Sequence, residues 1–188
     1  MREMLKIVIS LFAIFVGAGL ILSYVYAKTS TVIYNAQVRE KEAALKKMSP
    51  EAEKINVAGK WLLYEKPNEY YEAKKGNKVI SYIASTTGKG YSSYIKILVS
   101  TDPDLKIKAI DILSHSETPG LGDEIEKKDF KKQFEGKVLE NIELLKVETK
   151  DKIQAISGAT ISSRAVTKGV KEAVKLLNEK YGKGLSKE

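Results

Sequence analysis

The 188-residue sequence contains no cysteine and one histidine, His115. Without cysteine there is no disulfide framework, no thiolate-bound iron–sulfur cluster and no CxxCH haem attachment, and one histidine cannot make an ordinary structural zinc site. The sequence also lacks a GxSxG motif and a second candidate base, which argues against a Ser-His-Asp hydrolase. We therefore expect no metal site. If this chain carries electrons, an organic cofactor must hold them.

The formal net charge is +8, but it does not favour a nucleic-acid partner. The lysines alternate with glutamates along the segments expected to be helical, whereas a nucleic-acid interface gathers basic residues on one face. A basic exterior suits an anionic lipid surface or acidic partner subunits. We therefore expect no nucleic-acid binding.

A long uncharged run near the N-terminus predicts a membrane anchor. The run from Ile7 to Ala27 has 21 residues, and a helix rising about 1.5 Å per residue then crosses a bilayer core of about 30 Å. Arg2 and Lys6 precede it, so the positive-inside rule predicts a cytoplasmic N-terminus and an extracytoplasmic domain. A cleaved signal peptide is the alternative, but its apolar region is usually only about 7–15 residues. We expect residues 1–28 to be a retained, single-pass anchor in the cytoplasmic (inner) membrane.

The remainder of the sequence predicts an α+β fold. Thr31–Met48 is rich in Ala, Glu and Lys and is followed by Ser49-Pro50, which predicts a helical stalk over residues 29–50. Strand-forming residues between turn signals, whose short loops favour antiparallel neighbours, predict strands near 69–74, 78–87, 91–100 and 106–114. A helix over 123–134, short strands near 142–147 and 153–156, and a last helix follow. Residues 51–188 should thus form one antiparallel-sheet-rich domain with flanking helices.

The segment Ser157–Ser163, with the sequence SGATISS, places small and hydroxyl-bearing residues at the start of that last helix. Downstream, apolar residues recur at three- and four-residue spacing, as in a helix that buries one face. Thr160 then lies in the first turn, whose unpaired N–H groups and positive dipole end bind anions. Gly158 and Ala159 allow close approach. The alternative is an ordinary Ser/Thr helix cap.

Two further segments contain turn residues beside polar groups. In His115–Gly122, Pro119-Gly120 and Gly122 predict a tight turn where backbone lies near a ligand, with Glu117 and Thr118 beside it. The alternative is a surface loop between a strand and a helix. The segment Gly88–Tyr91, with the sequence GKGY, leads into a predicted strand and fits a hairpin turn equally well.

These segments together resemble the FMN-binding domain family, which includes the G subunit of Rnf complexes and the C subunit of sodium-translocating NADH:quinone oxidoreductase. SGAT at 157–160 resembles the family's attachment motif, ETPGLG at 117–122 its second hallmark, and residues 88–91 a weaker third. The resemblance implies FMN joined through a phosphoester to Thr160, with the phosphate lined by Ser157, Gly158, Ala159, Ser162 and Ser163. It further implies an isoalloxazine ring lying against Glu117, Thr118, Leu121 and Gly122.

The same resemblance implies a membrane-anchored flavoprotein that relays electrons in an Rnf-type ion-translocating complex. Its implied partners are the other membrane and redox subunits and a flavin transferase, which in many relatives recognises an Asp where this chain has Gln154. Thr160 would tether the cofactor, so no catalytic residue is expected. The G subunit fits better than the usually longer C subunit. The alternative is a non-redox extracytoplasmic binding or scaffold domain, and His115 has either a structural or a functional role.

Overall fold

The computed structural model describes residues 1–182. Residues 183–188, which the sequence analysis includes in the FMN-binding domain, lie outside the described residues. The chain divides into two compact units, with the boundary between Lys41 and Glu42.

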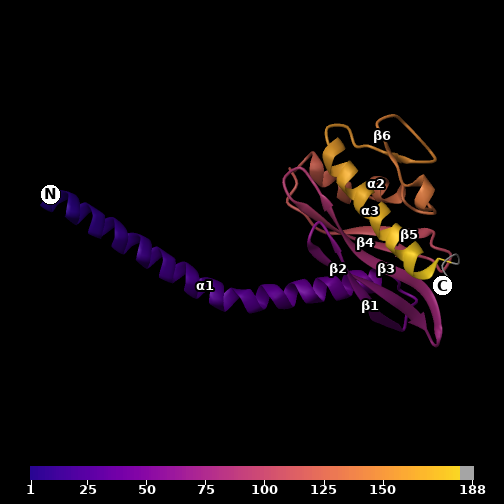
Figure 1. Ribbon diagram of the computed structural model, residues 1–188, viewed down its shortest axis with the longest axis horizontal. Coiled ribbons are helices and arrows are strands. Elements are labelled where there is room, and N and C mark those ends of the chain that lie inside the picture. The colour runs from indigo at the N-terminus through magenta and orange to yellow at the C-terminus, as the bar shows by residue number, and fades with distance from the viewer. Residues whose placement is uncertain (183–188) are drawn as a thin grey trace. The chain divides into compact units, whose positions relative to one another are not determined.

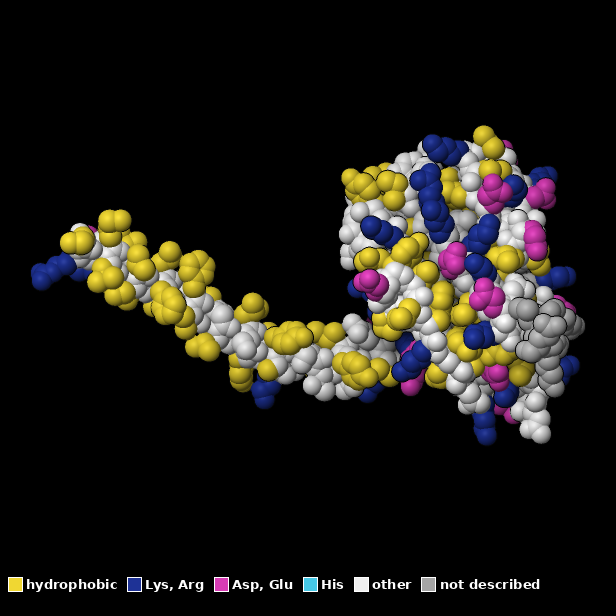
Figure 2. Space-filling model, in the orientation of Figure 1, with side chains coloured by type: hydrophobic (Ala, Val, Ile, Leu, Met, Phe, Trp, Pro, Cys, Tyr) yellow, Lys and Arg dark blue, Asp and Glu magenta, His cyan; other side chains and the backbone are white. Residues whose placement is uncertain are grey.

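The first unit consists of most of helix α1, which spans Arg2–Met48 (Figure 1). The predicted anchor and stalk thus form one uninterrupted helix. Up to Val38 its large apolar side chains are exposed, and Figure 2 shows them along its N-terminal part. Within residues 1–182 this is the one helix long and apolar enough to cross a membrane. Exposed apolar side chains on a helix of this length suit a lipid environment.

The second unit is built on a five-stranded antiparallel sheet. The strands lie in the sheet in the order in which they occur in the chain. They are β1 (Lys54–Leu63), β2 (Lys66–Lys75), β3 (Lys78–Lys89), β4 (Tyr94–Thr101) and β5 (Ile107–Ser114). The predicted α+β fold with an antiparallel sheet is confirmed.

Strand β1 is absent from the sequence prediction because its turn carries no familiar signal. Leu63 pairs with Lys66, so the hairpin loop consists of Tyr64 and Glu65 alone. Both have positive φ, 51° and 59°, as a two-residue hairpin turn of type I′ requires. Glycine or asparagine usually fills such positions. Here the pairing with β2 imposes this backbone on two bulkier residues.

Strands β3 and β4 carry most of the buried residues of the sheet, on both of its faces. Successive residues of a strand point to opposite sides, and in β4 Ile97 and Val99 pack under the last helix, α3 (Thr160–Tyr181), while Leu98 faces the other way. On that other face, Leu45 and Met48 from the end of α1 cover the sheet. Figure 1 shows α3 lying across the sheet. The last turns of α1 therefore belong to the folded domain.

Between β5 and α3 the chain forms short elements. They are the 3₁₀ helices η1 (Gly122–Glu126) and η2 (Leu139–Asn141), helix α2 (Lys128–Lys132), and strands β6 (Leu144–Leu145) and β7 (Ile153–Gln154). The prediction of one helix over 123–134 is wrong, because Lys127 is extended (φ −62°, ψ 142°). This break lets Ile125 and Phe130 both enter the core. The strands β6 and β7 are shorter than predicted and pair in parallel.

Candidate functional site

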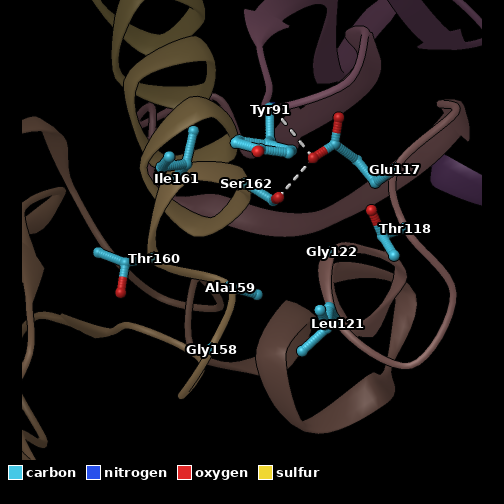
Figure 3. Close-up of a pocket in the computed structure, with 10 residues that line it drawn as sticks. All are labelled: Tyr91, Glu117, Thr118, Leu121, Gly122, Gly158, Ala159, Thr160, Ile161 and Ser162. Carbon is cyan, nitrogen blue, oxygen red and sulfur yellow. Dashed lines mark hydrogen bonds between the residues drawn. The ribbon is translucent and has the colours of Figure 1, made fainter.

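A cavity of about 370 Å³ lies at the start of α3 (Figure 3). Small-molecule sites typically have volumes of about 300–1,000 Å³. Three separate chain segments provide its lining: Tyr91; Glu117, Thr118, Leu121 and Gly122; and Gly158, Ala159, Thr160, Ile161 and Ser162. The fold therefore brings all three sequence motifs to one pocket.

The first turn of α3 presents unpaired backbone donors to this pocket. The helix is preceded by Ala159, and no side chain caps it. The N–H of Ser163 donates to the Ala159 carbonyl at 2.9 Å, so the three N–H groups before it have no acceptor within the helix. They belong to Thr160, Ile161 and Ser162, which line the pocket. The ordinary Ser/Thr cap considered for this segment is not what the structure contains.

Two of the five residues predicted around the phosphate lie outside the pocket lining. Ser163 is fully buried, and its hydroxyl donates to the Ala159 carbonyl at 2.9 Å and accepts from the Ile156 N–H at 3.1 Å. Its hydroxyl therefore shapes the turn before α3. Ser157 lines a different pocket of about 600 Å³, together with Gln154. Gly158, Ala159 and Ser162 do line the candidate site.

The Glu117 carboxylate, predicted to meet a ligand ring, is held by the protein itself. Only 6% of Glu117 is exposed. Its two oxygens accept hydrogen bonds from the backbone N–H groups of Tyr91, Ser92 and Ser93 at 3.0, 3.0 and 3.1 Å. The Ser162 hydroxyl donates a fourth bond at 2.5 Å. We call these four contacts the Glu117 clamp; Figure 3 shows two of them.

The clamp keeps Glu117 ionised. Burial raises the pKa of the carboxyl, but the hydrogen bonds from Ser162 and from the backbone of Tyr91, Ser93 and Ser92 outweigh it, and the pKa lies below its ordinary value. Hydrogen bonds to the charged form of a carboxyl have this effect. The pocket wall therefore contains a fixed negative charge.

The glycines of the motifs make room for this carboxylate and for α3. A Cβ on Gly90 would lie 2.4 Å from Glu117 Oε1, and one on Gly122 would lie 2.7 Å from Glu117 Cβ and 2.8 Å from Ser162 Oγ. The close approach at Gly122 is thus to Glu117 and Ser162. Gly120 has φ 74° with open space around it, so its conformation alone favours glycine. These contacts explain turn residues that the sequence analysis assigned to ligand approach.

His115 supports the same loop from outside the pocket. Its Nδ1 accepts the Glu117 N–H at 3.1 Å, and its Nε2 lies 2.9 Å from Glu126 Oε1. Because Nδ1 accepts a hydrogen bond, the ring N–H is on Nε2, which donates a hydrogen bond to Glu126. Of the two roles left open for His115, the structure favours the supporting one.

Tyr91 and Ile161 line the pocket although the sequence analysis did not select them as site residues. With Leu121 they form an apolar, exposed rim: 73%, 47% and 47% of Tyr91, Ile161 and Leu121 are accessible. Tyr91 directly follows the glycines of the GKGY segment, and this position is the sequence signal that could identify it as a site residue. Ile161 fits the apolar period of α3, and this pattern alone predicts a core position for it. No lysine or arginine is among the residues that line this pocket.

The sequence model of the FMN-binding domain family matches residues 90–175. The G subunit of the proton-translocating ferredoxin:NAD(+) oxidoreductase complex of Clostridium ljungdahlii is 42% identical, and the match covers 84% of this chain and 82% of that relative. The G subunit of the ion-translocating oxidoreductase complex of Aliivibrio fischeri is 34% identical, with 90% and 87% covered. Both matches extend well beyond residues 90–175.

Among solved structures, the fold is similar to that of the C subunit of the Na(+)-translocating NADH-quinone reductase from Parabacteroides distasonis. The TM-score is 0.52 at 24% identity, and the match covers 64% of this chain and 65% of that one. The chain thus spans just under two thirds of that protein's length. This likeness concerns the fold.

Proposed function

We propose that this chain, which belongs to the family of G subunits of ion-translocating oxidoreductase complexes, relays electrons through an FMN joined by a phosphoester to the Thr160 hydroxyl. The general function follows from the family: the chain is an FMN-binding electron-transport subunit of an ion-translocating complex. The covalent bond and the residue that forms it are the proposal.

The observation that carries the proposal is the position of Thr160. It is the first residue of α3, it lines the pocket, and it lies at the opposite end from Glu117 and Thr118 (Figure 3). A phosphate on its hydroxyl would meet the unpaired N–H groups of the first turn, which bind anions without a basic side chain. The rest of the pocket remains for the other end of the cofactor.

The walls of the pocket suit a flat aromatic ring. Tyr91, Leu121 and Ile161 offer exposed apolar surface, and Thr118 offers a polar contact beside them. Apolar walls with a few placed polar groups are typical of cofactor sites. When bound, FMN supplies one- or two-electron chemistry, while the protein binds and orients it.

The proposed partners are the other membrane and redox subunits of the complex and a flavin transferase. Gln154, at the position that the family resemblance assigns to transferase recognition, lines the second pocket, and its backbone N–H donates to Gln133 Oε1 at 2.6 Å. It does not line the candidate site, so we propose that the Thr160 phosphate chemistry is unaffected by the glutamine at this position. We further propose that α1 anchors the chain in the cytoplasmic membrane, with a cytoplasmic N-terminus and the flavin domain outside.

The test is the intact mass of denatured full-length protein made together with a flavin transferase. The parent should gain the mass of one FMN less one water, because the threonine hydroxyl and the phosphate condense. Thr160→Ala should carry no covalent flavin. Thr160→Ser should load partially, since it keeps the hydroxyl but loses the methyl group that restricts its rotamer.

Thr118→Ala is the matched control, because it removes the other threonine hydroxyl of the pocket and should leave covalent loading intact. A Thr160→Ala protein that still carried the added mass would place the bond elsewhere. A colourless, folded parent would favour the alternative of a non-redox binding or scaffold domain.

A further inference from the structure

One side chain connects the three segments of the pocket. The carboxylate of Glu117 belongs to the second motif, its three backbone donors belong to residues 91–93, and its hydroxyl donor is on α3. The strand β4 begins only at Tyr94, three residues later than predicted. The amides of residues 91–93 turn to Glu117 and leave the sheet ladder, so the clamp also sets the local backbone.

The clamp is specific to a carboxylate. Three successive backbone N–H groups that converge on one anion form a nest, which favours a negative charge. A glutamine in the same place would direct its amide N–H₂ group at one of these partly buried donors and leave that donor unpaired. Gly90 and Gly122 have no Cβ atoms, and Glu117 occupies the space that this leaves beside each of them.

We propose that Glu117 is the positioning residue of this pocket, which fixes its three walls in one geometry, and that its fixed charge makes the bound flavin harder to reduce. The second half rests on the proposed function. Reduction adds electrons to the ring, and an anion in a partly desolvated pocket wall opposes added negative charge. The four donors compensate part of that charge, so removing one donor strengthens the effect.

The positioning role is tested by amide hydrogen exchange on full-length protein made without a flavin transferase. Glu117→Gln should speed exchange at Tyr91, Ser92 and Ser93 by about tenfold or more, because the donors lose their charged acceptor. The matched control is Glu179→Gln, which removes one exposed carboxylate near the other end of α3. Amide exchange at residues 91–93 of Glu179→Gln should equal that of the parent. If Glu117→Gln also exchanged at the parent's rate there, the positioning role of Glu117 would be overturned.

The electrostatic role is tested by the flavin reduction potential of loaded full-length protein. Glu117→Gln removes the anion and should raise the potential. Ser162→Ala removes one donor but keeps the anion and should lower it. The control Glu179→Gln should match the parent. A merely loosened pocket would shift both test variants in the same direction, whereas the charge effect shifts them in opposite directions.

Shifts of the same sign, or potentials equal to that of the parent, would overturn the electrostatic role. If Glu117→Gln does not fold, Ser162→Ala decides alone, since an unchanged or raised potential contradicts the proposal. A chain that takes up no flavin would overturn the proposed function, while the exchange measurement still tests the clamp. The two failures are thus distinguishable.

Discussion

Gly90 lies 27 residues before Glu117 and Gly122 lies five residues after it, yet at the residue scale each of these glycines is explained by contact with Glu117. The glycines leave room for a carboxylate within 3 Å of where their Cβ atoms would lie. The carboxylate in turn accepts hydrogen bonds from the backbone N–H groups of residues 91–93, which lie outside the sheet. Because the contacts are reciprocal, a substitution at either glycine acts mainly by displacing Glu117.

A pH dependence of stability follows from the lowered pKa of Glu117. A carboxyl whose pKa is depressed by folding stabilises the folded state above its unfolded pKa, about 4.3, and loses that contribution as the pH falls through the folded value. Near neutral pH, Glu117→Gln should therefore be less stable than the parent by about 1–3 kcal/mol. Below about pH 4 that difference should shrink. Chemical denaturation of full-length protein at a series of pH values measures it.

Glu179→Gln provides the comparison, because Glu179 is exposed and its loss should leave the pH profile unchanged. A stability gap between Glu117→Gln and the parent that stays constant from neutral to acidic pH would contradict the prediction. It would mean that the variant acts through shape alone.

At the scale of elements, the pocket depends on how α3 sits on the sheet. A Cβ on Gly88 of β3 would lie 2.4 Å from the Ala165 carbonyl oxygen of α3, and Thr86 donates a hydrogen bond to the Gly169 carbonyl at 3.0 Å. At the other end, the ring of Tyr181 stacks on Tyr82 with centroids 4.0 Å apart. Helix α3 is thus fixed along its length, which places its first turn at the pocket.

Gly88→Ala should destabilise the protein by about 2 kcal/mol or more, because the added methyl group meets helix backbone that cannot rotate away. Gly169→Ala is the matched control on the facing helix. Its Cβ would meet the end of the Ile97 side chain at 3.1 Å, and alanine favours a helix over glycine by about 1 kcal/mol. Its stability should stay within about 1 kcal/mol of the parent. Denaturant midpoints compare the two, and equal losses would contradict this packing argument.

At the scale of the whole molecule, the proposal of an extracytoplasmic domain can be tested because the chain has no cysteine. In a single-cysteine variant, a thiol reagent therefore labels only the introduced cysteine of this chain. Lys106→Cys lies at an exposed position of the domain, and Glu3→Cys lies before the uncharged run. In cells with a permeabilised outer membrane, an impermeant thiol reagent should label Lys106→Cys but should label Glu3→Cys only after lysis. The reverse pattern would place the domain in the cytoplasm.

The sequence by itself determined what depends on neighbours along the chain. The uncharged run before Lys28 predicts a long apolar helix, the period after Thr160 predicts α3, and turn residues such as Gly76-Asn77 separate the strands. The motif segments also marked most of the pocket lining. These features depend on the composition and spacing of residues that are close in sequence, so they can be predicted without knowing the tertiary contacts.

Only the tertiary structure decided what depends on partners distant in the chain. Pairing with β2 imposes a hairpin on Tyr64 and Glu65, and packing of Ile125 and Phe130 into one core breaks the predicted helix at Lys127. The same holds for the site, where Glu117 faces protein donors from two distant segments. A hydrogen bond between residues far apart in sequence leaves no local pattern, because its geometry exists only once the sheet and α3 have packed.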